Sequence, residues 1–288
     1  MGRKEHGLDS HQKKKRIELY FFSSINFLDY NFLGMTVITD NQFDALKPIK
    51  ETNKKHYNEF ELDFEFDAEN QIGILPMPVG GKISFFGQIQ LVPIQGSFSI
   101  YGSNLSPWMS YPAYAPQNQG LVLTCTKGSS SAKGYELDQN VKKVLESLLL
   151  KIKNKKNALI GLVGCTKNGL LGIQGVLDTT RHILEYDSNS DVKIDGFYHV
   201  QNNSASFLEF PVMWEDCLNT IRKEVDIMCI MGARNSGKST FARYSMNSLL
   251  STYESIAFLE CDPGQSEFTP PGIVSLNIVS KPCIGKPI

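Results

Sequence analysis

The sequence lacks several features that would assign it to common classes of protein. No apolar stretch approaches the ~20 residues that a membrane-spanning helix requires, so we expect no membrane partner. The first residues, Met1 to Glu5, have no apolar core, so we expect no secretory signal. The six cysteines are scattered, with no CxxC spacing and no histidine pairing. This argues against a zinc site and for reduced thiols in an intracellular compartment.

Neither charge nor hydrophobicity is extreme, and together they describe a globular chain. Of the 288 residues, 41% are hydrophobic and 20% are charged, which suits one large domain or two smaller ones. The net charge of −1 conceals a basic start, where Lys13 to Arg16 form a run that indicates a nuclear address, a nucleic-acid contact or a solvated tail. Residues 59–69 alternate acidic and apolar side chains, which predicts a solvated edge strand or a protein-docking strip.

The pattern of apolar residues divides the chain before residue 225 into two regions. Residues 1–60 have no sustained periodicity, and we expect a basic, poorly ordered N-terminal region. Residues 61–224 contain short strand-like runs between glycines, which indicates a β-rich domain resembling a sandwich or barrel, with some helices. A helix is predicted from about Asp138, its N-cap, to Lys153, and the prolines of residues 103–120 predict a loop. The predicted strands of this region are 71–75, 82–86, 88–92, 97–101, 121–126, 158–163 and 196–200.

The clearest motif of the chain begins at Gly232 and matches the phosphate-binding pattern G-x-x-x-x-G-K-[ST]. An apolar run, residues 225–231, precedes it and predicts a buried strand, while residues 239–250 have no glycine or proline and predict a helix. A helix that starts after a glycine-rich loop directs unpaired N–H groups at an anion. The motif therefore predicts a nucleotide site, in which Lys238 reaches the β- and γ-phosphates and Ser239 holds Mg²⁺.

A second motif follows the predicted helix. Residues 255–262 form an apolar run that ends in the carboxylates Glu260 and Asp262, and ligands gather at the carboxyl ends of parallel strands. A carboxylate placed there can order Mg²⁺ or accept a proton from an attacking hydroxyl group. The run continues into "DPGQSEFTPPG", residues 262–272, which is more elaborate than a simple ATPase needs.

The two motifs together resemble the eukaryotic polynucleotide 5′-hydroxyl kinases, in particular the nucleolar branch that processes pre-ribosomal RNA. The resemblance rests on "GARNSGKSTFAR" and "FLECDPGQSEFTPPGIVSL", and more weakly on "GQIQLVPIQGSFSIYGSNL" in the β-rich region. It covers roughly residues 71–288 and implies an α/β P-loop NTPase fold with an incomplete parallel sheet after the β-rich domain. Residues 225–288 would then be the N-terminal part of a kinase domain, truncated before the lid arginines of the family.

The resemblance also implies a role for each motif residue. ATP and Mg²⁺ would be the cofactors, Lys238 and Asp262 the catalytic residues, and Ser239 and Asp262 the metal ligands. Glu260 is a second choice for positioning metal or water, with a purely structural acid as the alternative. Gln265 and Glu267 would lie near the RNA end. The residues expected to bind the nucleotide are Gly232, Ala233, Arg234, Asn235, Ser236, Gly237, Lys238, Ser239 and Thr240.

Three functions remain open on the sequence. The first is ATP-dependent phosphorylation of RNA 5′-hydroxyl ends in pre-rRNA processing, in the nucleus and nucleolus, with a partner endonuclease. The second is a non-catalytic, nucleotide-binding partner subunit or a decayed fragment of such a kinase. The third is an unrelated P-loop ATPase, which "DPGQSEFTPPG" disfavours. If the chain is truncated as the resemblance implies, we expect only feeble phosphoryl transfer from residues 1–288 alone, because lid arginines contribute ~10³–10⁵ in rate.

Overall fold

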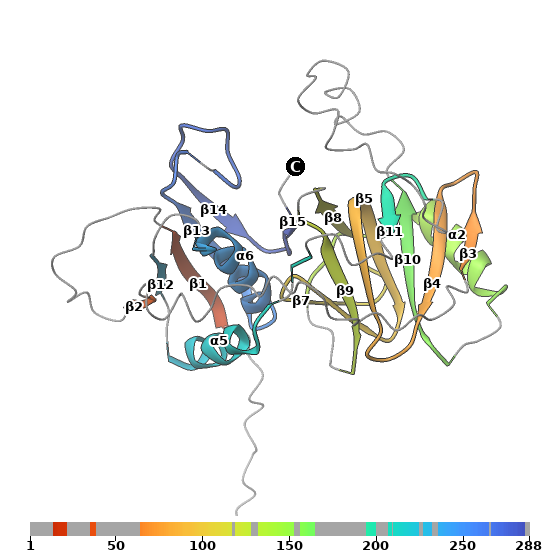
Figure 1. Ribbon diagram of the computed structural model, residues 1–288, viewed down its shortest axis with the longest axis horizontal. Coiled ribbons are helices and arrows are strands. Elements are labelled where there is room, and N and C mark those ends of the chain that lie inside the picture. The colour runs from red at the N-terminus through yellow and green to blue at the C-terminus, as the bar shows by residue number, and fades with distance from the viewer. Residues whose placement is uncertain are drawn as a thin grey trace, which may run out of the picture.

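The computed structural model describes two sheets that lie side by side, each covered by helices (Figure 1). For residues 14–21 and 35–38 it describes the backbone only. None of the helices in the described part of the chain is long and apolar enough to cross a membrane. The described residues are 14–21, 35–38, 64–116, 119–127, 132–152, 156–164, 194–199, 207–208, 210–224, 227–231, 236–264 and 266–285.

The larger sheet is mainly antiparallel and is built from the middle of the chain. Its main path runs β3-β4-β10-β5-β9-β6-β7, and β8 and β11 also pair with the long strand β5. Its strands are β3 (Glu65–Asp67), β4 (Ile72–Met77), β5 (Lys82–Gln95), β6 (Ser97–Ile100), β7 (Ser103–Leu105), β8 (Tyr111–Ala115), β9 (Leu121–Thr126), β10 (Ala158–Gly164), β11 (Phe197–His199) and β15 (Ile284–Gly285). The prediction of a β-rich region is therefore confirmed at this coarse level.

Two local predictions in this region were wrong. Residues 103–120 contain the strands β7 and β8, because β8 pairs along β5 despite Pro112, and the buried Tyr111 hydroxyl donates to the Ala132 carbonyl oxygen over 2.7 Å. The strands predicted on either side of Gly87 are one continuous strand. Gly87 has a φ of +104°, and a Cβ there would lie 2.1 Å from the Gly196 carbonyl oxygen, so glycine lets β11 approach instead of ending the strand.

Helix α2 (Gln139–Leu149) packs on the larger sheet as its apolar spacing predicts. The predicted N-cap is confirmed: Asp138 Oδ1 accepts the backbone N–H groups of Asn140 and Val141 over 2.8 and 3.2 Å. Leu145 and Leu148 are buried with side chains of β4 and β10. This helix is at the far end of the larger sheet from the second sheet (Figure 1).

The smaller sheet combines the two ends of the chain, in the order β14-β13-β1-β12-β2. All of its neighbours pair in parallel except β13 and β14, which are antiparallel. The strands are β1 (Lys14–Phe21), β2 (Met35–Ile38), β12 (Ile227–Ile230), β13 (Tyr253–Glu260) and β14 (Ser275–Val279). The expectation of a poorly ordered, peripheral N-terminal region is wrong for β1 and β2, because β1 lies in the centre of this sheet and the basic run from Lys14 to Arg16 begins it.

Two helices pack against this sheet. Helices α5 (Val212–Glu224) and α6 (Lys238–Leu249) form one core with β12 and β13. Helix α5 therefore belongs with the smaller sheet, which we call the phosphate-loop half, and not with the larger sheet, which we call the β-rich half. Met228 and Ile230 on β12 and Ile256 on β13 are buried. The exposed apolar side chains of the sheet, among those described, are Leu276 and Ile278 on the edge strand β14.

The two halves are joined by aromatic packing and by backbone contacts. The rings of Tyr101, Phe210 and Tyr244 are in contact, with centroids 5.0 and 4.7 Å apart. Asn247 Nδ2 on α6 donates to the Tyr101 carbonyl oxygen over 2.9 Å, and β15 returns from the smaller sheet to pair with β8. The β-rich half is therefore a structural neighbour of the phosphate-loop helix.

Gly102 is a position where this junction tolerates no side chain, so we predict that Gly102→Ala destabilises the fold. Its φ is +81°, and an added Cβ would lie 2.7 Å from the Tyr244 carbonyl oxygen. Gly80 is a matched control, with a φ of +83° and no atom within 4 Å of an added Cβ. Gly80→Ala should cost ~1–2 kcal/mol for backbone strain alone, and Gly102→Ala a further ~1–3 kcal/mol for overpacking. Equal losses in urea-unfolding free energy would contradict a close contact at the junction.

Candidate nucleotide-binding site

The phosphate-loop helix begins at the predicted place. Helix α6 starts at Lys238, and its N-cap is Gly237, which has a left-handed φ of +94° and no side-chain hydrogen bond that caps the helix. Glycine is required there because other residues rarely adopt this conformation. The four predicted nucleotide-binding residues Gly232, Ala233, Arg234 and Asn235 lie outside the described residues.

The start of α6 offers groups that suit a phosphate. Ser236 is only 5% exposed, and its buried Oγ has no hydrogen-bond partner within the described part of the chain. The first N–H groups of α6 lack a side-chain cap and carry the positive end of the helix dipole. Lys238 is 7% exposed, and Ser239 and Thr240 are partly exposed on the first turn. An uncapped helix end beside an unsatisfied hydroxyl group fits an anionic ligand.

The register of the smaller sheet brings the second motif to the same edge as the phosphate loop. Phe21, the last residue of β1, is opposite Ile230 on one side and Glu260 on the other. Ile230 and Glu260 are the last residues of β12 and β13, which run in parallel with β1 between them. With neighbouring strands 4.7–4.9 Å apart, the two strand ends are about 10 Å from each other. Met231 and Cys261, which follow these two strand ends, therefore lie at the same edge of the sheet.

Asp262 follows the end of β13 and is only partly buried. Its Oδ1 accepts the backbone N–H of Gly264 over 3.1 Å, which forms a local turn. The segment closes again where the Gly272 N–H donates to the Pro263 carbonyl oxygen over 2.7 Å. The "DPGQSEFTPPG" motif is therefore a closed loop with Asp262 at its base, which leaves the carboxylate partly accessible at the sheet edge.

We considered Glu260 as a residue that positions metal or water, and its buried position does not favour that role. It is fully buried, and its carboxylate accepts the backbone N–H groups of Glu267 and Phe268, the latter over 3.4 Å. Burial raises the pKa of Glu260 above its usual range, although these two N–H donors oppose the shift. The alternative interpretation is favoured: this acid holds the loop that follows Asp262 and faces no solvent.

That Gln265 and Glu267 lie near the RNA end stays a prediction, and Gln265 lies outside the described residues. The side chain of Glu267 is 13% exposed and pairs with Arg243 of α6. Arg243 was missed by the sequence analysis, and so was Tyr101, whose ring is under the guanidinium group. Both residues lie inside stretches that carry the family resemblance, but those stretches do not indicate the contact, because the pairing depends on the packing of segments far apart in the chain.

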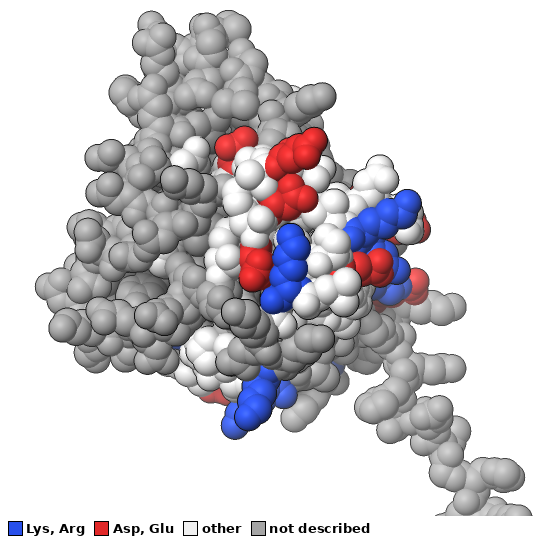
Figure 2. Space-filling model, turned by 90° about the vertical axis from the view of Figure 1, so that its right-hand side faces the viewer, with Lys and Arg blue, Asp and Glu red and all other residues white. Residues whose placement is uncertain are grey.

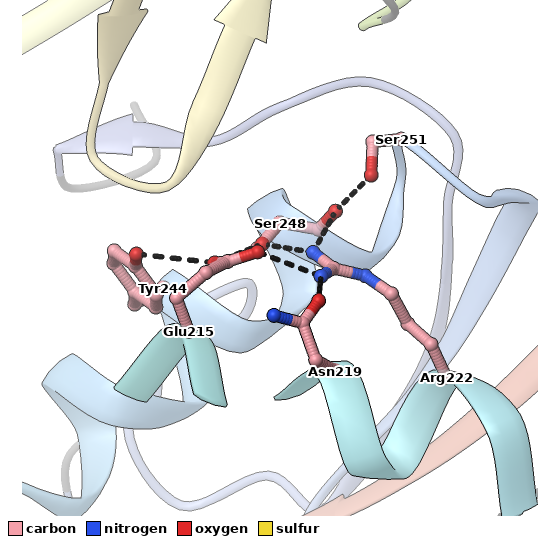
Figure 3. Close-up of polar contacts among 6 residues, drawn as sticks. All are labelled: Glu215, Asn219, Arg222, Tyr244, Ser248 and Ser251. Carbon is pink, nitrogen blue, oxygen red and sulfur yellow. Dashed lines mark hydrogen bonds and ion pairs between the residues drawn. The ribbon is translucent and has the colours of Figure 1, made fainter. Parts of the chain in front are cut away.

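A polar cavity of about 460 Å³ lies at the opposite end of α6 from Lys238, and its position argues against a role in phosphate binding. Arg222 on its wall donates to Glu215 Oε1 and Asn219 Oδ1, both over 2.6 Å, and to Ser248 Oγ over 2.5 Å (Figure 3). Glu215 Oε2 accepts in turn from Ser248 Oγ and, at 3.4 Å, from Tyr244. These groups pair with one another, although Arg222 Nε is buried without a hydrogen-bond partner among the described residues, and the network joins α5 to α6 as a structural contact.

Comparison with known proteins defines the class of this site. The family model described as "mRNA cleavage and polyadenylation factor CLP1 P-loop" matches residues 232–287, which contain both motifs. The chain also resembles proteins named polynucleotide 5′-hydroxyl-kinase. It is 32% identical over 234 residues to nol9 of Dictyostelium discoideum, which covers 71% of this chain. The resemblance inferred from the motifs is thus confirmed.

Other relatives match over different lengths. NOL9 of Homo sapiens is 43% identical over 76 residues, or 25% of this chain and 11% of the relative. The nol-9 protein of Caenorhabditis elegans is 25% identical over 245 residues, or 76% of this chain and 43% of the relative. The chain spans 33% of the length of the Dictyostelium relative. The likeness therefore covers most of this chain but only part of each of these relatives.

Lys238 is the residue on which nucleotide binding should depend most, and we predict that Lys238→Ala weakens binding of Mg·ATP by roughly tenfold to hundredfold. That range corresponds to losing a charge-assisted hydrogen bond of about 1.5–3 kcal/mol. The measurement is isothermal titration calorimetry, with Lys133→Ala as the control because that exposed lysine pairs only with Glu254 on the surface. Equal affinity of wild type and Lys238→Ala would refute the site.

The buried carboxyl group of Glu260 should make stability depend on pH. Because its folded-state pKa is raised, the native protein retains this proton as the unfolded chain loses it above the ordinary value of 4.5. The stability of wild type relative to Glu260→Gln should therefore be highest below pH 4.5 and fall as pH rises through the folded-state pKa. Urea unfolding across this range measures the difference, with the exposed Glu254→Gln as control. A pH-independent difference would contradict the raised pKa.

Proposed function

We propose that this protein transfers the γ-phosphoryl group of Mg·ATP to the 5′-hydroxyl group of RNA. The observation that carries the proposal is the sheet register, in which the strands before the phosphate loop and before Asp262 end about 10 Å apart at one edge. The names of the relatives supply the type of acceptor, a polynucleotide 5′-hydroxyl group. The match of both motifs to one P-loop family supports the use of a nucleotide.

The proposed mechanism assigns a separate task to each residue. The N–H groups at the start of α6 and the Lys238 ammonium group bind the phosphate oxygens and offset the charge that develops on them. Asp262 accepts the proton of the RNA 5′-hydroxyl group as that oxygen attacks the γ-phosphorus in line. The new O–P bond forms as the bond to the bridging β–γ oxygen breaks, and ADP leaves. Mg²⁺ held by Ser239 and Asp262 would supply further positive charge to the phosphates.

The donor set fits magnesium better than a metal held by protein side chains alone. The described residues contain no group of three or more His, Cys, Asp or Glu side chains that could hold a metal ion. Magnesium in phosphoryl-transfer enzymes takes only one or two protein ligands and fills the remaining positions with water and phosphate oxygens. A hydroxyl group from Ser239 and a carboxylate from Asp262 are therefore a sufficient protein contribution.

We further propose a substrate in pre-ribosomal RNA, a partner endonuclease and a nuclear, nucleolar location, all on the family resemblance. The basic run at Lys14 to Arg16 no longer supports that location independently, because it is part of β1. The end of the β-rich half shown in Figure 2 carries acidic and basic side chains intermingled, without a broad basic area among the described residues. RNA binding by phosphate contacts needs such an area, so we do not place the RNA on this face.

The second candidate function is a nucleotide-binding subunit that docks a partner. The exposed Leu276 and Ile278 on β14 favour it, because exposed apolar side chains on an edge strand commonly mark an interface. This candidate predicts binding of Mg·ATP without phosphoryl transfer. Transfer of labelled γ-phosphate to a 5′-hydroxyl RNA oligonucleotide separates the two candidates.

Asp262 is the residue that distinguishes the catalytic function, and we predict that Asp262→Asn lowers the transfer rate by about 10²–10⁴. The amide is nearly isosteric but cannot accept the proton, so the affinity for ATP without metal should change little. Asp216→Asn is the control, because this exposed carboxylate is on α5, outside the loop. Transfer at the wild-type rate by Asp262→Asn would remove Asp262 from the mechanism.

A further inference from the structure

Arg243 is a buried cation on the phosphate-loop helix that no motif explains. It is on α6 about one turn beyond Thr240, and it is only 6% exposed. Its Nη2 donates to both carboxylate oxygens of Glu267, on the loop that begins with Asp262. Burial disfavours its charge, but Tyr101 and Glu267 outweigh that effect and raise the pKa of Arg243. The cation therefore stays charged and joins the helix to the loop.

The loop is held from two directions at Glu267. The side chain pairs with α6 through Arg243, and the backbone N–H donates to the buried carboxylate of Glu260 on β13. Asp262 is between these two anchored glutamates in the sequence, and its own contacts are local to the loop. The position of Asp262 relative to the start of α6 thus depends on the Arg243–Glu267 pair.

The β-rich half supplies a third contact to this pair. Tyr101, with a φ of +47°, places its ring 5.6 Å from the Arg243 guanidinium carbon, and Arg243 Nη1 donates to its hydroxyl group over 3.4 Å. The side chain of Thr240, on the first turn of α6, lies near the same hydroxyl group. One tyrosine from the other sheet therefore contacts both the phosphate-binding turn and the cation that holds the loop.

We propose that Arg243 is a positioning residue for phosphoryl transfer, which fixes Asp262 against the phosphate-binding turn, and that Tyr101 couples this arrangement to the β-rich half. The inference rests on the proposed function, because it concerns the placement of the same catalytic carboxylate. In-line transfer requires the reacting atoms to be held closely, and a misplacement of about 1 Å can cost ~10² in rate. Binding of ATP depends on the phosphate loop itself and is not expected to share this loss.

The first test replaces each partner conservatively. Arg243→Lys and Glu267→Gln should bind ATP without metal within about twofold of wild type, yet their single-turnover transfer to a 5′-hydroxyl RNA oligonucleotide should slow by about 10–100-fold. Arg222→Lys is the matched control: this arginine also pairs with a glutamate, Glu215, but at the other end of α6 (Figure 3). It should lower the melting temperature without slowing transfer beyond its effect on stability.

A charge exchange separates positioning from loss of folding. Arg243→Glu combined with Glu267→Arg restores an opposite-charge pair, so it should transfer faster than Arg243→Glu alone. Tyr101→Phe keeps the ring but removes the hydroxyl group, and should slow transfer by about two- to tenfold, the worth of a single hydrogen bond. An unchanged rate in Arg243→Lys, or an equal loss of rate, affinity and melting temperature without recovery in the exchanged pair, would overturn the proposal.

Hydrogen exchange keeps the inference testable if the wild-type protein transfers no phosphate. That result would refute the proposed function, whereas the positioning role still predicts faster exchange of the amides of residues 261–272 in Arg243→Lys. Exchange in α2, far from the pair, should be unchanged. If the amides of residues 261–272 exchange at the wild-type rate in Arg243→Lys, the pair does not hold the loop and the inference fails.

Discussion

The parallel pairing of β1 with both β12 and β13 is the constraint on which the candidate site depends. Parallel strands end at one edge of a sheet, and here the ends of β12 and β13 are opposite the same residue, Phe21. The phosphate loop and the acidic loop leave from this edge as a consequence of register alone. Side-chain contacts then refine the arrangement. The Arg243–Glu267 pair joins α6, the helix after the phosphate loop, to the loop that begins with Asp262.

The β-rich half helps to form the candidate site because it contacts α6, the helix that begins at the phosphate loop. Tyr101 and Gly102 form a tight turn that the helix covers, and Asn247 bonds both to that turn and to the Cys283 backbone. Buried aromatic rings surround these hydrogen bonds and exclude water, which strengthens the bonds. The two sheets thus form one structure around the helix that carries Lys238.

Local features were predictable from the sequence, and long-range ones were not. The phosphate-loop helix, the Asp138 cap and the strand at 121–126 follow from short motifs and periodicity, which the chain carries within a few residues. The place of β1 could not be predicted, because an isolated run from Lys14 to Phe21 carries no information about partners far along the chain. The same reason hid the pairing of Arg243 with Glu267.

The central place of β1 has a consequence for the order in which the chain folds. Its partners β12 and β13 lie more than 200 residues further along, whereas most strands of the larger sheet have partners fewer than about 100 residues away. At about 5–20 residues per second, a ribosome needs roughly 10–40 s to complete that distance. During this interval the larger sheet can form, but β1 waits without its neighbours. Closing so long a loop is slow, so the nascent N-terminus depends on protection from aggregation until β13 has been made.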